Sequence, residues 1–240
     1  IEKGIVTFDD AIKSGIPLNT TQRRQVESEQ LQLPTHIDRL GIRSFLDTLW
    51  YPLYFLDFET FQTGIPMYDG VRPYQQVPLQ YSLHILANED ATLGHKEFLA
   101  DENFDPRRAL ADQLVADIPT DACVLAYNKG FECRCLKELA EIFPDLSDRL
   151  LAIRENVRDL LEVFRHGYVY DRAMGGSFSI KKVLPAIFPD NPNLDYHNLE
   201  DVHNGTEATD TYLALRGRER AARDKMRQSL LMYCGLDTLA

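Results

Sequence analysis

Apolar residues along the chain gather in short runs, and longer amphipathic stretches separate them. The runs at 51–58 and 122–126 are short and contain aromatic or small apolar residues, which predicts buried strands. We therefore expect an α/β fold with a leading antiparallel meander, in which a mixed central sheet is flanked by helices. The pattern predicts further strands at 78–87 and near 94–99, and helices at 105–117, from Phe131 to Ala140, at 178–188, at 206–216 and from Arg218 to Leu239.

The first 50 residues differ in composition from the rest of the chain. Residues 20–33 are polar and glutamine-rich with a helical pattern, and an amphipathic segment at 37–49 follows Pro34. We interpret residues 1–50 as an N-terminal connector to an upstream domain that ends in a helix packed against the sheet. Residues 51–240 then form the main domain.

The first predicted strand ends in two acidic residues, Asp57 and Glu59. Side chains alternate between the two faces of a strand, so these carboxylates point the same way and Phe58 points the opposite way. Two neighbouring carboxylates repel each other and are costly to bury, and a shared cation removes both costs. The alternative is a strand that ends at the surface with both acids in solvent.

Two later stretches offer further acids. Glu132 falls in the first turn of a helix that follows a strand, where ligands bind in open α/β sheets, although the helix dipole alone also favours an acid there. Tyr233 and Asp237 are four residues apart on the last helix and share a face, a pattern that a buried tyrosine beside a surface acid also produces. Four carboxylates can hold two Mg²⁺ or Mn²⁺ ions, which clamp the attacking and leaving oxygens of a phosphodiester. We therefore expect a metal-dependent nuclease.

The order of these motifs resembles a known family. Asp-x-Glu at 57–59, Asn-x-x-x-acid at 128–132 and Tyr-x-x-x-Asp at 233–237 are similar to the three motifs of the DEDDy branch of the DnaQ-like 3′–5′ exonucleases, which have an RNase H-like fold. The segments at 157–161 and 179–184 resemble a strand and a helix of the same family, so the resemblance covers about residues 51–240. One departure is Glu132, since the family usually has aspartate there.

More narrowly, the amino-acid sequences of residues 54–60 and 127–132 resemble those of an uncharacterised bacterial domain family. Its members often follow a RecB-like nuclease segment in a longer chain.

The exonuclease resemblance implies a role for each residue of the site. Asp57 would bridge two metal ions, and Glu59 and Asp237 would hold the ion beside the attacking water. Glu132 would support the second ion, and the hydroxyl of Tyr233 would orient the water. The substrate would be the 3′ end of a single-stranded nucleic acid or short oligonucleotide. The substrate-binding candidates are Thr60 and Phe61, which would touch or stack on the terminal nucleotide, with Asn128, Lys181, Arg220 and Arg223.

The charge distribution bears on how a nucleic acid would bind. The formal net charge is −11, of which residues 1–150 carry −10 and residues 151–240 carry −1. Six basic residues and two acidic ones occupy positions 216–227, and this run either guides a phosphate backbone or forms a solvated helix face. The overall acidity argues against tight binding to long duplexes and is compatible with a short single-stranded end.

Other features of the sequence bear on the location of the protein and exclude several kinds of site. No apolar run is long enough to span a bilayer and no signal peptide is evident, so we expect a cytoplasmic protein whose four cysteines are free thiols. Cys133-x-Cys135 lacks the spacing of a zinc site, and neither a Gly-rich phosphate loop nor a Gly-x-Ser-x-Gly motif is present. Two alternatives to the enzyme remain open. One is a degenerate RNase H-like module that binds nucleic acid or a partner, and the other is a structural domain that supports an upstream nuclease domain.

Overall fold

A computed structural model describes residues 4–194, 196–199 and 201–240. The chain divides into two compact units. Unit 1 contains residues 1–48 and 161–191, and unit 2 contains residues 49–160 and 192–240. Residues 161–191, which the sequence placed in the main domain, therefore join the N-terminal segment in one unit.

Unit 2 is built on a five-stranded mixed sheet with the strand order β4-β3-β2-β5-β6. The first three strands pair antiparallel as a meander, whereas β5 is parallel to β2 and β6 is parallel to β5. The predicted mixed sheet with its leading meander is thus confirmed. The strands are β2 (Leu53–Phe61), β3 (Val77–Leu86), β4 (Gly94–Leu99), β5 (Cys123–Ala126) and β6 (Val157–Asp159).

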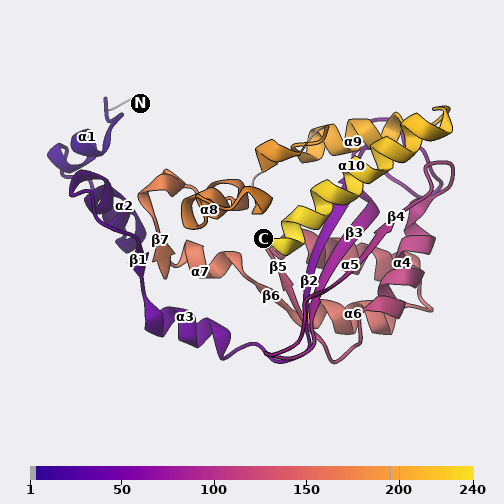
Figure 1. The fold of residues 1–240 in the computed structure, drawn as a ribbon, viewed down its shortest axis with the longest axis horizontal. Coiled ribbons are helices and arrows are strands. Elements are labelled where there is room, and N and C mark those ends of the chain that lie inside the picture. The colour runs from indigo at the N-terminus through magenta and orange to yellow at the C-terminus, as the bar shows by residue number, and fades with distance from the viewer. Residues whose placement is uncertain (1–3, 195, 200) are drawn as a thin grey trace. The chain divides into compact units, whose positions relative to one another are not determined.

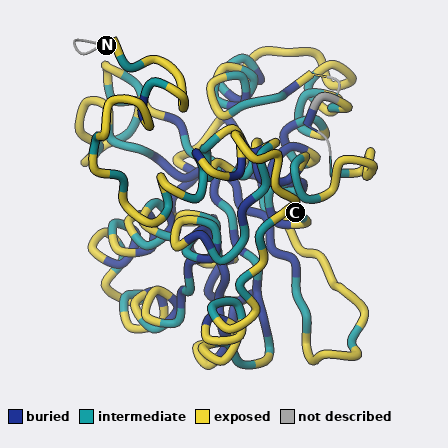
Figure 2. The backbone as a smooth tube through the Cα atoms, turned by 90° about the vertical axis from the view of Figure 1, so that its left-hand side faces the viewer, coloured by how far each residue is buried: buried dark blue, intermediate teal, exposed yellow. Residues whose placement is uncertain are grey.

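Helices cover both faces of this sheet (Figure 1). Two short 3-10 segments, Pro192–Leu194 and Tyr196–Asn198, precede the last two helices in the chain. Residues of β2, β3, β5 and β6 are mostly buried, whereas β4 at the edge of the sheet is mostly exposed. Buried segments run through the interior of the molecule and exposed ones lie at its periphery (Figure 2). One face carries α4 (Pro106–Asp117), α5 (Gly130–Ile142) and α6 (Ser147–Glu155), and the other carries α9 (Gly205–Leu213) and α10 (Arg220–Leu239).

Side-chain alternation makes the two faces of the sheet chemically different. Leu56 and Phe58 of β2 lie in the apolar core together with Tyr81 of β3 and Leu136 of α5. The ring of Phe58 meets that of Tyr81 edge to face, with 6.3 Å between the ring centroids. The residues between them on β2 and β3 point the other way and are largely polar. The apolar core therefore fixes the sheet from one side and leaves polar side chains on the side of α10.

Unit 1 is mostly helical. Its short strands pair antiparallel, and Tyr170, Met174 and Val183 form a small core. Within the described part of the chain, no helix combines the length and the apolar character that crossing a membrane requires. The elements of unit 1 are α1 (Phe8–Lys13), α2 (Thr20–Gln30), β1 (His36–Ile37), α3 (Arg39–Leu46), α7 (Leu161–Arg165), β7 (Val169–Tyr170), a 3-10 turn at Arg172–Met174 and α8 (Ile180–Ile187).

Candidate metal centre

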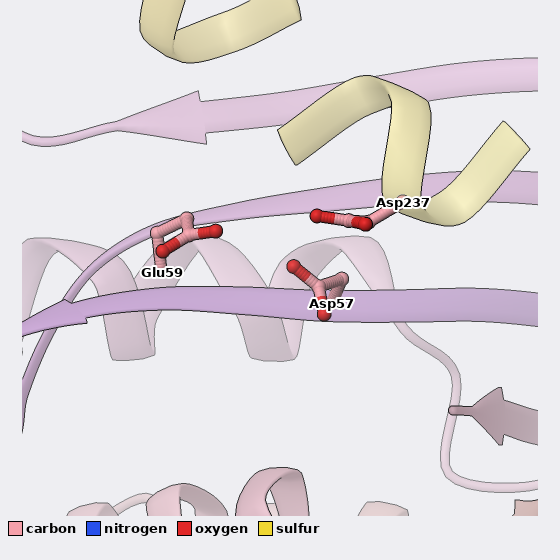
Figure 3. Close-up of side chains that lie close together, drawn as sticks. All are labelled: Asp57, Glu59 and Asp237. Carbon is pink, nitrogen blue, oxygen red and sulfur yellow. The ribbon is translucent and has the colours of Figure 1, made fainter. Parts of the chain in front are cut away.

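Three of the four predicted carboxylates meet on the polar face of the sheet. Asp57 and Glu59 project from β2 toward α10, and Asp237 comes down from the last turns of α10 to meet them (Figure 3). One carboxylate oxygen from each residue lies within 4.8 Å of the others. Residues 180 positions apart in the sequence therefore form one acidic cluster, which consists of Asp57, Glu59 and Asp237.

Polar side chains of β3 hold α10 over the sheet. Gln80 donates a hydrogen bond from Nε2 to the carbonyl oxygen of Leu230 at 2.9 Å. The hydroxyl of Thr238 lies 2.7 Å from that of Ser82 and 2.8 Å from Nδ1 of His84. Burial, aided by a neighbouring histidine, lowers the pKa of His84 to about 4, so its ring is neutral at pH 7. Since Thr238 directly follows Asp237, these contacts fix the position of the third acid.

Asp57 lies in an unfavourable environment for a charged carboxylate. Burial raises the pKa of its carboxyl group well above the usual value, and the charges of Asp237, Glu59 and Glu132 raise it further. The thiol of Cys234 on α10 approaches its Oδ2 at 3.6 Å and acts in the opposite direction. A cation shared by these carboxylates would offset both the burial and the repulsion.

Glu132 is the fourth predicted acid, and it lies beside the cluster without belonging to the group of three. It is 3% exposed in the first turn of α5. Its Oε2 atom is buried and has no hydrogen-bond partner among the described residues. Burial raises its pKa to about 7, and the charge of Asp159 adds to that rise. Because buried acceptors in proteins are normally paired, this oxygen fits a site that a cation or water completes.

The turn before α5 explains how Glu132 is positioned. Asn128 adopts a left-handed conformation with φ +70°, which asparagine tolerates better than most residues. Its backbone N–H donates to Oδ1 of Asp159 at the end of β6, at 2.9 Å. This bond ties the end of β5 to the neighbouring strand, so α5 starts where its first turn faces β2. Asn128 thus contributes through its backbone to the orientation of the second motif.

Two tyrosines border the acidic cluster. Tyr233 is buried on α10, and burial together with the charge of Asp237 raises the pKa of its phenol. Tyr196 donates a hydrogen bond to Oδ1 of Asp237, and its ring lies edge-on to that of Tyr233 at 6.3 Å. No sequence pattern pointed to Tyr196 as a site residue, because it falls in an irregular segment without hydrophobic periodicity.

Other predicted substrate residues take different positions. Thr60 is partly buried, and its carbonyl oxygen accepts a hydrogen bond from the hydroxyl of Thr209 on α9 at 3.1 Å. Phe61 is 2% exposed and stacks on Tyr212 of α9, with 5.8 Å between the centroids. The prediction that Phe61 stacks on a nucleotide is therefore wrong in this structure, because α9 covers its ring. Lys181 belongs to α8 of unit 1.

Several arginines of the basic run at 216–227 are paired with acidic residues of the protein itself. Arg227 donates to Oε2 of the buried Glu102 at 3.2 Å, and Arg223 lies 3.7 Å from Oε1 of the same carboxylate. Arg220 is exposed and lies 3.7 Å from Asp224. Two of the arginines therefore hold the loop before α4, and this observation favours a structural role for them over the guidance of a phosphate backbone.

Crowding of the acidic cluster predicts that Asp57→Asn stabilises the protein when divalent cations are absent. The substitution removes one of three close negative charges, so the free energy of unfolding in EDTA should rise by about 1–3 kcal/mol. Urea denaturation at pH 7.5 measures this change. Asp90→Asn is the matched control, because it makes the same charge change in the exposed loop after β3 and should alter stability by less than about 0.5 kcal/mol. A destabilised Asp57→Asn variant would contradict the repulsion.

Comparisons with known proteins place the chain among uncharacterised bacterial sequences. It is 31% identical over 146 residues to the "Uncharacterized protein MG366 homolog" of Mycoplasma pneumoniae, a match that covers 55% of this chain and 22% of the relative. It is 28% identical over 177 residues to the "Uncharacterized protein MG366" of Mycoplasma genitalium, covering 67% of this chain and 26% of that protein. The chain thus spans about a quarter of the length of these curated relatives.

No solved structure matches the chain. A family model does match residues 54–179, more than half of the sequence, and includes Asp57, Glu59 and Glu132. The expected similarity to an uncharacterised bacterial domain family is therefore confirmed. The chain belongs to the family described as Domain of unknown function (DUF2779).

Proposed function

We propose that unit 2 is a metal-dependent 3′–5′ exonuclease-like domain of the DEDDy type with an RNase H-like fold. The observation that carries the proposal is the meeting of Asp57 and Glu59 from β2 with Asp237 from α10, with their oxygens within 4.8 Å. Neither strand alternation nor helix periodicity alone requires these elements to meet. Their convergence is what the order of the three sequence motifs leads one to expect of an exonuclease site.

The sheet topology supports the same proposal. The meander β2–β3–β4 comes first in the chain, and the parallel strands β5 and β6 follow it on the other side of β2. The first acids therefore lie on the central strand, and Glu132 follows the neighbouring parallel strand. Brought together in this way, the acids lie where α/β sheets commonly bind ligands.

The donor set suits a hard divalent cation. Asp57, Glu59 and Asp237 offer only carboxylate oxygens, which Mg²⁺ and Mn²⁺ prefer over nitrogen or sulfur ligands. These three residues would hold one ion, and Asp57 with Glu132 would hold a second. The unpartnered Oε2 of Glu132 fits this assignment. When bound, the ions would supply Lewis-acid stabilisation of the negative charge that develops on the phosphate.

Tyr233 has a role that follows from its environment. Because burial and nearby carboxylates raise its pKa, the phenol remains protonated at neutral pH and cannot serve as a base. Its hydroxyl can instead hydrogen-bond the attacking water and orient it. That water attacks phosphorus, and the bond from phosphorus to the 3′ oxygen breaks. The products are a nucleoside 5′-monophosphate and a strand with a new 3′-hydroxyl.

A second candidate is a degenerate module that binds nucleic acid or a partner, or that supports an upstream nuclease domain. Two observations favour it: glutamate stands where the exonuclease family has aspartate, and the chain spans only about a quarter of its curated relatives. Such a module would bind its partner without hydrolysing a phosphodiester. The assay below therefore separates the two candidates.

Incubation with 5′-labelled single-stranded DNA and RNA should shorten the strands from the 3′ end in Mg²⁺ or Mn²⁺ and not in EDTA. Asp57→Asn should lower the rate by about 10³-fold or more, since it removes the carboxylate common to both proposed ions. Asp90→Asn, with the same change of charge, should retain the wild-type rate. An absence of shortening with either metal, or an equal rate for Asp57→Asn, would refute the exonuclease.

Tyr233→Phe should lower kcat by about 10- to 100-fold, because it removes only the hydroxyl that orients water. Its affinity for Mn²⁺ should stay close to that of the wild type. Tyr212→Phe provides the control, since it removes another buried tyrosine hydroxyl in the same unit. Loss of Mn²⁺ affinity in Tyr233→Phe would show that the phenol supports the metal site instead.

A further inference from the structure

A cavity opens directly beside the acidic cluster. It has a volume of about 530 Å³, and Glu59 lines it together with Thr60, Gln62, Gln76 and Phe131. We call it the proximal pocket. The first turn of α9 closes its far side: a Cβ added to Gly205 would lie 3.9 Å from Oε2 of Glu59. Because Glu59 belongs to both the cluster and the pocket wall, a molecule bound in this pocket can contact one of the three acids directly.

A second cavity continues from the first. This distal pocket has a volume of about 440 Å³ and is lined by Arg72, Tyr74 and Arg134, together with the same Gln62 and Gln76. Two side chains that line both cavities place them next to each other along one groove. The groove runs between the loop that joins β2 to β3, residues 62–76, and helix α5.

Two arginines and one glutamate line the distal pocket, so its charged side chains sum to a net positive charge. Arg72 and Arg134 are both exposed, and neither forms an ion pair within the described part of the chain. The acid in this pocket, Glu138, accepts a hydrogen bond from Nε2 of Gln75 at 2.9 Å. In contrast, Arg223 and Arg227 are engaged with Glu102. In a chain with a net charge of −11, two guanidinium groups without a carboxylate partner beside one cavity can attract an anion.

Aromatic rings accompany these charges. Tyr74 is 71% exposed, and it is held in a left-handed conformation while its N–H donates to the carbonyl oxygen of Thr63 at 2.9 Å. Phe131 is partly exposed in the proximal pocket, and the guanidinium of Arg134 lies 5.9 Å from its ring centroid. Basic and aromatic side chains both line the groove. Proteins that hold single strands use this combination, since bases stack on rings and phosphates meet cations.

We propose that this groove binds a single-stranded nucleic acid, with its terminal nucleotide in the proximal pocket. The phosphate that joins the preceding nucleotides lies against Arg72 and Arg134, and an upstream base stacks on Tyr74. This inference rests on the proposed function for the chemistry at the acidic cluster, but the groove itself can be tested by binding alone. It assigns strand binding to the loop at 62–76 and to α5, and not to the basic run at 216–227.

Binding of fluorescein-labelled dT8 and rU8, measured by anisotropy in the Asp57→Asn background, tests the groove without hydrolysis. The added double substitution Arg72→Gln/Arg134→Gln should weaken binding at least tenfold at low salt. It should also reduce the magnitude of the log–log salt slope by about 1.4, because each lost phosphate contact contributes about 0.7. The matched control, Arg39→Gln/Arg154→Gln, removes the same charge from exposed positions away from the groove and should bind as its parent does. Tyr74→Ala should weaken binding about tenfold, and Tyr74→Phe should not.

A minimal substrate separates failure of the groove from failure of the proposed function. In a chain with Asp57 intact, the p-nitrophenyl ester of thymidine 5′-monophosphate reaches only the proximal pocket, so the arginine double variant should cleave it at the wild-type rate and dT8 more slowly. Equal binding of dT8 by the arginine variant and its control, or no binding by the parent, would overturn the groove. Arginine-dependent binding without hydrolysis of either substrate would support the groove and overturn the exonuclease.

Discussion

Repulsion among Asp57, Glu59 and Asp237 is the interaction on which the arrangement of unit 2 depends. Three carboxylates with oxygens within 4.8 Å of one another would separate if the backbone allowed it. The backbone does not allow it. β2 is paired on both edges, and Gln80, Ser82 and His84 of β3 fix α10 over the sheet. The thiol of Cys234 and the phenol of Tyr196 donate to the cluster without neutralising it. The protein therefore stores an unfavourable charge that a cation can relieve.

One face of the sheet holds the apolar core that stabilises the fold, and the other face carries the polar side chains of the candidate site. The face toward α4, α5 and α6 is apolar and contains fully buried residues such as Tyr81, Leu110 and Leu136. That core stabilises the fold and so allows the opposite face to carry acids, amides and imidazoles. The acidic cluster is negatively charged, whereas the groove beside it is lined by the positively charged Arg72 and Arg134. An anionic strand would thus meet cations along the groove and carboxylates only at its end, where metal ions would balance both.

Sequence patterns predicted the local geometry better than the long-range contacts. Strand alternation was sufficient to put Asp57 and Glu59 on one face, and helix periodicity put Tyr233 and Asp237 on another. Neither strand alternation nor helix periodicity could show that Tyr196 contacts Asp237, because Tyr196 lies in a segment without a periodic pattern of apolar residues. Phe61 shows the opposite error: an aromatic residue beside two acids suggested a nucleotide platform, and only the packing of α9 reveals that Tyr212 covers it. The partner of Arg227, Glu102, lies 125 residues away in the sequence, so the sequence alone did not show that arginines of this run are paired within the protein.

The most direct test is a calorimetric titration of the wild-type domain with Mn²⁺ in parallel with Asp57→Asn. If the carboxylates form a two-ion centre, the wild type will bind two Mn²⁺ ions per chain, and Asp57→Asn will lose measurable heat from both, because it lacks the ligand they share. No heat from the wild type at millimolar Mn²⁺, or the same isotherm for the two proteins, would mean that the acidic cluster is not a metal centre.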